Sequence, residues 1–139
     1  MKDLQEVEGF SSIESNEHVR VLRENVIETS DTEEITKLVI QDKLLVLDFT
    51  AKWCQPCKVV NETIREVSPK YTETVMFCKA DADRLNGLRH AFNVSGLPTL
   101  LFIKKGRLLD RSVGTLNSAK LMNIIDRCLQ GNTNEHLNT

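Results

Sequence analysis

The chain has 139 residues, which is the size of one domain and leaves no room for two full hydrophobic cores. Its composition, 40% apolar and 27% charged, is that of a soluble globular protein rather than a disordered one. A formal net charge of -2 provides no overall field that would attract nucleic acid or anionic lipid. The longest apolar run, residues 97–103, falls far short of the roughly 20 residues that a membrane-spanning helix needs. We therefore expect neither a nucleic-acid nor a membrane partner.

The first 24 residues are more acidic than the rest of the chain. They contain six acidic and three basic residues and only scattered apolar ones, which indicates an acidic N-terminal extension over residues 1–24 rather than part of a core. We expect a flexible arm, with partner binding as the alternative. The first twenty residues lack the apolar segment of a secretory signal and are too acidic for a transit peptide, so we expect a cytoplasmic protein.

Strand and helix signals alternate from Asn25 onward. Residues 26–29 form a short strand candidate. Ser30 and Glu33 have the spacing of a capping box, which predicts a helix that begins there and runs to about residue 40. The apolar run at residues 44–49 is typical of a central strand that is covered on both faces.

The second part of the pattern ends in a hairpin and a closing helix. A helix starts at a pair of cysteines and ends near a Ser-Pro pair, a strand and a short amphipathic helix follow, and two strands then flank a tight turn. These elements and the final helix are expected at residues 54–68, 75–80, 85–92, 99–104, 108–113 and 121–129, before a C-terminal tail at 131–139. The order β-α-β-α-β-α-β-β-α predicts an α/β fold, with a central mixed β-sheet flanked by helices, over residues 25–130.

The sequence Cys54-Gln55-Pro56-Cys57 lies where a buried strand ends and a helix begins. Unpaired backbone N–H groups and the positive end of the helix dipole favour a thiolate at Cys54. Cys57 lies one helical turn further on, so its sulfur can reach that of Cys54 but is more shielded. We expect Cys54 to be the nucleophile that attacks a disulfide and Cys57 to resolve the mixed disulfide. Pro56 fits the first helical turn because its missing N–H would be unpaired there.

Half of a zinc site is the main alternative for this cysteine pair. The other two cysteines, Cys78 and Cys128, stand singly in a strand and a helix, and the three histidines have no ligand spacing, so we expect no metal. Cys78 and Cys128 are interpreted as packed thiols, with regulatory disulfides as the alternative.

The motifs around the cysteine pair resemble the thioredoxin family. The resemblance covers residues 25 to about 130 and rests on Phe49-Thr50-Ala51-Lys52-Trp53-Cys54-Gln55-Pro56-Cys57-Lys58, Lys79-Ala80-Asp81, Leu97-Pro98-Thr99 and Gly114. It is closer to eukaryotic cytosolic thioredoxins than to bacterial ones, because Thr50 stands where bacterial members often have Trp. The resemblance implies a thioredoxin-like fold and a monomer that reduces disulfides in protein substrates. It implies no bound cofactor, electrons from NADPH through a thioredoxin reductase, and clients such as peroxiredoxins.

The resemblance also implies roles for further residues. Pro98 would be the cis-proline opposite the disulfide, where the preceding backbone pairs with a substrate strand. Asp48 would accept the proton of Cys57, and Lys79 would modulate Asp48. From the residues alone, Asp48 could be a solvated edge residue, although its apolar neighbours favour burial, and Lys79 could be an ordinary surface charge. The substrate groove would be formed by Trp53, Gln55, Pro56, Gly96, Leu97, Pro98 and Gly114.

The chain departs from the family pattern at two positions. Gln55 stands between the cysteines in place of the usual Gly, and Glu62 stands where a kink-forming proline is expected. Neither change removes a catalytic atom, but Gln55 leaves the redox potential and the partner preference open. Two other functions also remain open for this fold: a disulfide oxidase or isomerase, in which His is often found inside the motif, and a non-catalytic binding module.

Overall fold

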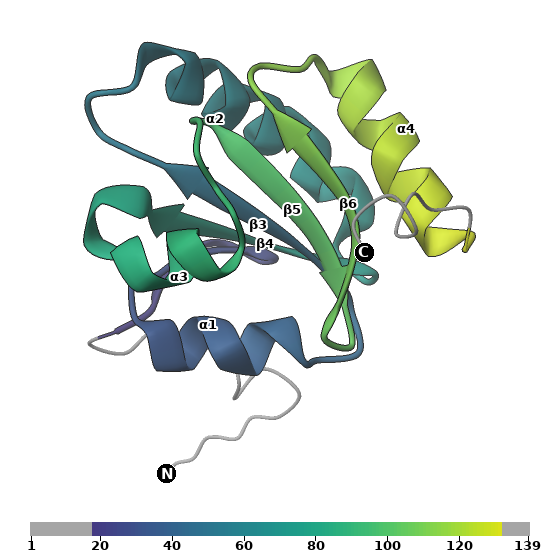
Figure 1. Ribbon diagram of the computed structural model, residues 1–139. Coiled ribbons are helices and arrows are strands. Elements are labelled where there is room, and N and C mark those ends of the chain that lie inside the picture. Colours follow the sequence, from purple (N-terminus) through teal and green to yellow (C-terminus); the bar gives the residue numbers. More distant parts are fainter. Residues whose placement is uncertain (1–17, 132–139) are drawn as a thin grey trace, which may run out of the picture.

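The computed structural model describes residues 18–131. They form a six-stranded sheet in the order β1-β2-β4-β3-β5-β6, and helices cover both of its faces (Figure 1). The strands are β1 (Arg20–Arg23), β2 (Val26–Glu28), β3 (Leu44–Thr50), β4 (Val75–Asp81), β5 (Thr99–Lys104) and β6 (Arg107–Val113). The helices are α1 (Thr32–Val39), α2 (Gln55–Val67), α3 (Asn86–Ala91) and α4 (Ser118–Leu129), with 3₁₀ turns at Ser68–Tyr71 and Ala82–Arg84. The predicted α/β fold with a central mixed sheet is confirmed.

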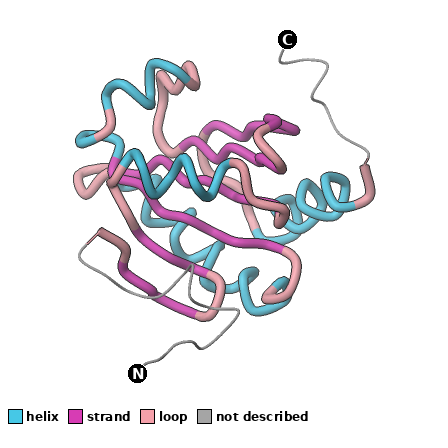
Figure 2. Tube along the Cα trace, turned by 90° about the horizontal axis from the view of Figure 1, so that it is seen from below, coloured by secondary structure: helices cyan, strands magenta, loops and turns pink. Residues whose placement is uncertain are grey.

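The sheet is parallel at its centre and antiparallel toward β6. Strands β2, β4 and β3 are parallel, whereas β5 and β6 pair antiparallel with their neighbours. Six of the seven residues of β3 are buried because helices pack on both of its sides (Figure 2). Val46 belongs to the core under α2 and α4, and Leu47 to the core under α1. Since side chains alternate along a strand, Asp48 lies on the same face as Val46.

Strand β1 lies outside the predicted domain. Residues 20–23 pair antiparallel with β2, and Val19 just before them is only 5% exposed. The hydroxyl of Thr29 donates a hydrogen bond to the backbone carbonyl of His18, which ties this segment to the end of β2. The folded part therefore begins before the predicted boundary at Asn25. Residues 1–17 of the predicted flexible arm and residues 132–139 of the predicted tail at 131–139 lie outside the described residues.

The cap of α1 is one residue later than predicted. Asp31, not Ser30, is the N-cap residue, and its carboxylate accepts a hydrogen bond from the backbone N–H of Glu34 at 3.1 Å. The hydroxyl of Ser30 accepts a hydrogen bond from the backbone N–H of Asp81 at 3.2 Å. Ser30 thus joins the loop after β2 to the end of β4 instead of capping the helix.

The hairpin between β5 and β6 has a shorter turn than predicted. Lys105 and Gly106 both have positive φ, at 52° and 80°, which is the backbone of a two-residue turn between antiparallel strands. The second strand therefore begins at Arg107 rather than at residue 108. Gly106 suits the second turn position because glycine enters the left-handed region without strain, whereas Lys105 adopts it as a non-glycine residue.

Candidate active site

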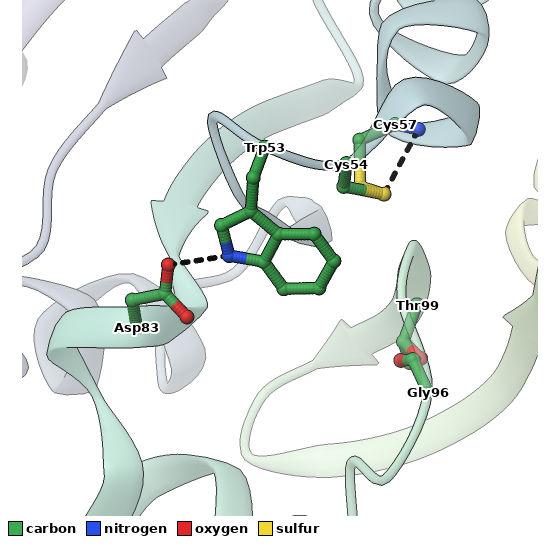
Figure 3. Close-up of a disulfide and its surroundings, with 6 residues drawn as sticks. All are labelled: Trp53, Cys54, Cys57, Asp83, Gly96 and Thr99. Atoms are coloured by element: carbon green, nitrogen blue, oxygen red, sulfur yellow. Dashed lines mark hydrogen bonds between the residues drawn. A yellow bond between two sulfur atoms is a disulfide. The ribbon is translucent and has the colours of Figure 1, made fainter.

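The cysteine pair lies where β3 ends and α2 begins, as predicted (Figure 3). Cys54 and Cys57 form a disulfide, and their Cα atoms are 5.3 Å apart. Cys54 is the N-cap residue of α2, and its sulfur accepts a hydrogen bond from the backbone N–H of Cys57 at 3.2 Å. Cys54 and Cys57 are 3% and 1% exposed, so the predicted difference in shielding is small. The two cysteines differ in this hydrogen bond more than in their exposure. The bond indicates that the start of the helix stabilises the thiolate form of Cys54.

Trp53 lies beside the disulfide and is 67% exposed. Its indole Nε1 donates a hydrogen bond to Oδ2 of Asp83 at 2.7 Å, which holds the ring in place (Figure 3). Asp83 belongs to the 3₁₀ turn after β4, and its backbone N–H donates to the carboxylate of Asp81 at 3.0 Å. Asp83 is therefore a member of the site that the sequence analysis missed. Gln55, the residue after Cys54, is also exposed.

The loop that leads into β5 faces the disulfide (Figure 3). The peptide bond between Leu97 and Pro98 is cis, as expected, and Leu97 packs against the small apolar cluster of Ala51, Cys54 and Cys57. The hydroxyl of Thr99 donates a hydrogen bond to the carbonyl of Gly96 at 2.6 Å. The carbonyl of Pro98 accepts a hydrogen bond from the backbone N–H of Gly114 at 2.8 Å. The second of these contacts joins the cis-proline loop to Gly114 after β6, so predicted groove residues of two separate loops lie together.

Two large apolar side chains are exposed near the disulfide and the cis-proline loop that faces it. Val113, at the end of β6, is 62% exposed and, with Trp53, is one of the few large apolar side chains of the described residues that face solvent. Val113 lies close to the cis-proline loop, since a Cβ placed on Gly96 would be 3.5 Å from its Cγ1. Exposed apolar side chains next to a disulfide and a cis-proline loop form a surface that can contact another polypeptide.

Asp48 lies below the surface on the α2 side of the sheet. It is 1% exposed, and neither of its carboxyl oxygens accepts a hydrogen bond from a described residue. Burial raises the pKa of Asp48 from 3.8 to about 7, and the charge of Lys79 partly opposes this rise. Lys79 lies opposite Asp48 in the register of β3 and β4. The structure thus excludes the solvated edge position for Asp48 and places Lys79 beside it.

Cys78 and Cys128 are free and buried, as packed thiols should be. Burial raises the pKa of Cys78 to about 12 and that of Cys128 to about 11, which keeps both thiols protonated and unreactive at neutral pH. They belong to the two separate cores on opposite faces of the sheet, so they do not pair with each other. Within residues 18–131 no three His, Cys, Asp or Glu side chains gather closely enough to hold a metal ion. None of the helices in that range has the length and apolar character to cross a membrane.

The fold and the site together define a class of protein. It is an α/β domain in which a CxxC disulfide at the start of a helix faces a cis-proline loop. The sequence profile of the family named Thioredoxin matches residues 25–127 of this chain. The chain belongs to the thioredoxin family, and the predicted thioredoxin-like fold is confirmed.

Known proteins that are similar to the chain include thioredoxins of plants and animals. Thioredoxin H7 of Arabidopsis thaliana is 45% identical over 73 residues, which cover 52% of this chain and 56% of that protein. Thioredoxin-T of Drosophila melanogaster is 36% identical over 90 residues, which cover 65% of this chain and 57% of that protein. The matched region of the chain thus spans little more than half the length of these two relatives. The resemblance to eukaryotic thioredoxins is confirmed.

Solved structures of thioredoxins share the fold. The thioredoxin of Plasmodium falciparum has a TM-score of 0.65 and 29% sequence identity, and the match covers 72% of this chain and 96% of that one. The thioredoxin of Trypanosoma brucei brucei has a TM-score of 0.71 and 27% identity, with 78% and 96% covered. The described domain therefore corresponds to nearly the whole of these two structures.

Proposed function

We propose that this chain is a protein-disulfide reductase of the thioredoxin type, which passes two electrons from its Cys54 and Cys57 dithiol to a disulfide in a client protein. The observation that carries the proposal is the hydrogen bond from the backbone N–H of Cys57 to the sulfur of Cys54. A donor at the start of a helix stabilises a thiolate, and the thiolate is the form that attacks a disulfide. Membership of the thioredoxin family and the intact cysteine pair support the same activity.

The first step forms a mixed disulfide. The thiolate of Cys54 attacks one sulfur of the client disulfide, so that a bond forms between Cys54 and the client while the client S–S bond breaks. The second client sulfur leaves as a thiolate and takes a proton from water. An extended client segment pairs with the backbone before Pro98, and its apolar side chains lie against Trp53 and Val113.

The second step releases the reduced client. The Cys57 thiol gives its proton to the Asp48 carboxylate, and the resulting thiolate attacks the sulfur of Cys54. The Cys54–Cys57 disulfide forms as the bond between Cys54 and the client breaks, and the client sulfur that Cys54 had attacked leaves as a thiolate and takes a proton from water. A carboxyl group with a pKa of about 7 suits this task, because at neutral pH it can both accept a proton and return it to solvent. Lys79 has a modulating role, since its charge limits how far the pKa of Asp48 rises.

Membership of the thioredoxin family suggests the electron donor, the clients and the cellular location of the protein. The oxidised protein accepts electrons from NADPH through a thioredoxin reductase, and peroxiredoxins and other disulfide-containing proteins are its clients. It works in the cytoplasm as a monomeric electron carrier, without a bound cofactor, and maintains cell redox homeostasis. The similarity to the plant H-type relatives supports this assignment.

Reduction of insulin by the purified protein tests the proposal. With dithiothreitol as the electron source, the wild type should accelerate insulin precipitation and Cys54→Ser should abolish the acceleration. Cys78→Ser is the matched control. It should keep the wild-type rate because Cys78 lies in the core under α1, on the face of the sheet opposite to α2. The absence of acceleration by the wild type would favour the binding-module alternative. A reduction potential near the roughly -180 mV of disulfide isomerases, instead of the roughly -270 mV of thioredoxins, would favour the isomerase alternative.

A further inference from the structure

Four charged residues of alternating sign lie in one row across the sheet. The strand register places Arg20 of β1 opposite Glu28 of β2, and Glu28 opposite Lys79 of β4. Lys79 in turn lies opposite Asp48 of β3. Register partners on neighbouring strands project from the same face of a sheet. The row therefore runs from the exposed edge of the sheet to the buried carboxyl group.

The row lies on the face that α2 covers. The residues two positions earlier in β2, β4 and β3 all belong to the core under α2 and α4 (Val26, Phe77 and Val46). Two neighbouring cavities, of about 370 Å³ and about 130 Å³, open beside the row, and both are lined by Glu28, Asn61 and Lys79. Solvent thus reaches the middle of the row, whereas Asp48 at its end is buried.

Glu28 lies between two cations. Its Oε1 atom is 3.4 Å from Nη1 of Arg20, and their side chains are 40% and 77% exposed. An ion pair as exposed as this contributes little to stability. Its importance lies in its position, because the Glu28 carboxylate can be attracted either to Arg20 or to Lys79. Arg20 also lies outside the region that matches the family profile, residues 25–127.

We propose that Arg20 and Glu28 are positioning residues that set how strongly Lys79 acts on Asp48, and thereby the pH at which Asp48 accepts the proton of Cys57. This inference rests on the proposed function. When Arg20 holds Glu28, Lys79 is left to interact with Asp48. Loss of Arg20 frees Glu28 to pair with Lys79, which weakens the attraction between Lys79 and Asp48 and raises the pKa of Asp48. Loss of the Glu28 charge has the opposite effect, because Lys79 then has no competing carboxylate.

Other charged side chains face the row from the elements packed around it. Arg23 of β1 and Arg65 of α2 line the larger cavity, while Lys52, Lys58 and Asp81 line the smaller one. These charges are the same in the wild type and in variants of Arg20 or Glu28. Differences between such variants therefore report on the row itself.

The test is to titrate Asp48 by carboxyl ¹³C NMR in the full-length oxidised protein. Register partners two strands apart are about 10 Å from each other, and at that distance a unit charge shifts a titration by about half a pH unit. Glu28→Gln should lower the midpoint of Asp48 by about that amount, and Arg20→Gln should raise it by a few tenths of a unit. Arg20→Lys keeps the charge and should preserve the wild-type midpoint. In the double variant that carries both Arg20→Gln and Glu28→Gln, the midpoint of Asp48 should equal that of Glu28→Gln alone, because Arg20 acts through Glu28.

Arg23→Gln is the matched control. Arg23 is the same residue type on the same strand and also lines the larger cavity, but its register partner is Val26 rather than Glu28, so its loss should shift the midpoint less than the loss of Arg20. Equal shifts from Arg20→Gln and Arg23→Gln, or an Arg20 effect that persists in the double variant, would overturn the inference. The pH profile of client release should shift with the NMR midpoints. If the midpoints move as expected but Asp48→Asn releases clients at the normal rate, the proposed role of Asp48 fails while the charge row stands.

Discussion

Replacing Asp48 with Asn should stabilise the protein at neutral pH and slow its chemistry. The carboxyl group is 1% exposed, and burial raises its pKa from 3.8 to about 7. An acid whose pKa is higher in the folded than in the unfolded state keeps its proton in the folded protein after the unfolded chain has lost it. The contribution of Asp48 to stability should therefore be most favourable below about pH 4, fall as the pH rises to about 7, and then level off.

The size of this effect follows from the pKa shift. A rise from 3.8 to about 7 corresponds to a loss of about 4 kcal/mol in the free energy of unfolding, at about 1.4 kcal/mol per pH unit. Asn at this position cannot ionise, but it introduces N–H donors where neither carboxyl oxygen has a hydrogen-bond partner among residues 18–131, at a cost of about 1–3 kcal/mol. We expect Asp48→Asn to be more stable than the wild type by about 1–3 kcal/mol at pH 8 and less stable at pH 4, where Asp48 is neutral.

Urea unfolding between pH 4 and 8 measures this difference, with Asp42→Asn as the control. Asp42 is exposed in the turn before β3, so its substitution should change the free energy of unfolding by less than about 0.5 kcal/mol at every pH. Single-turnover release of a reduced client should slow at least about tenfold in Asp48→Asn, because the proton acceptor is lost. A stability difference that does not vary with pH would refute the burial argument, and an unchanged rate would refute the catalytic role.

Three other changes test the fold and the site. A chain that lacks residues 1–24 should be about 1–3 kcal/mol less stable in urea than one that lacks residues 1–17, because β1 and the buried Val19 are lost. Equal stabilities of the two chains would contradict the packing of β1. Trp53→Phe loses the hydrogen bond to Asp83 and should lower kcat/KM for insulin several-fold. The free energy of unfolding should change by less than about 1 kcal/mol because the ring is exposed. An unchanged kcat/KM would show that the orientation of the ring does not contribute to activity. The side chain of Asn25 is buried and donates to three backbone carbonyls, so Asn25→Leu should cost about 2–4 kcal/mol by thermal or urea unfolding, and a cost below 1 kcal/mol would show that these bonds are replaceable.

The central elements could be predicted because their patterns are long and their boundaries are marked. Strand β3 has an almost continuous apolar run, which only a doubly covered strand explains. Helix α2 begins at the cysteine motif and ends just before Ser68-Pro69, where a proline prevents regular continuation. The cap of α1 was misplaced because Ser30 and Asp31 are both good N-cap residues and each is followed three positions later by Glu.

Strand β1 could not be predicted from its own residues. It has only four residues, most of them exposed, so it shows no alternation that differs from a loop. Its pairing depends on contacts with β2 that no local pattern encodes. This is typical of a short edge strand, which is defined by its neighbour more than by its composition.

The site shows the same limit. Cys54, Cys57 and Asp48 could be found because they lie within ten residues of one another, at the end of one strand and the start of one helix. The partner of Trp53 could not, because Asp83 is thirty residues away and is brought near by a turn at the end of another strand. The charge row from Arg20 to Asp48 depends likewise on the register of four strands.

The most direct test of the proposed mechanism is to identify the cysteine that holds the client. Cys57→Ser, incubated with oxidised insulin and digested without reducing agent, should give a stable mixed disulfide whose mass-spectrometric map places insulin on Cys54. Cys54→Ser should trap no insulin under the same conditions. Insulin attached to Cys57 in Cys54→Ser, or normal turnover by Cys57→Ser, would contradict the assignment of Cys54 as nucleophile and Cys57 as resolving cysteine.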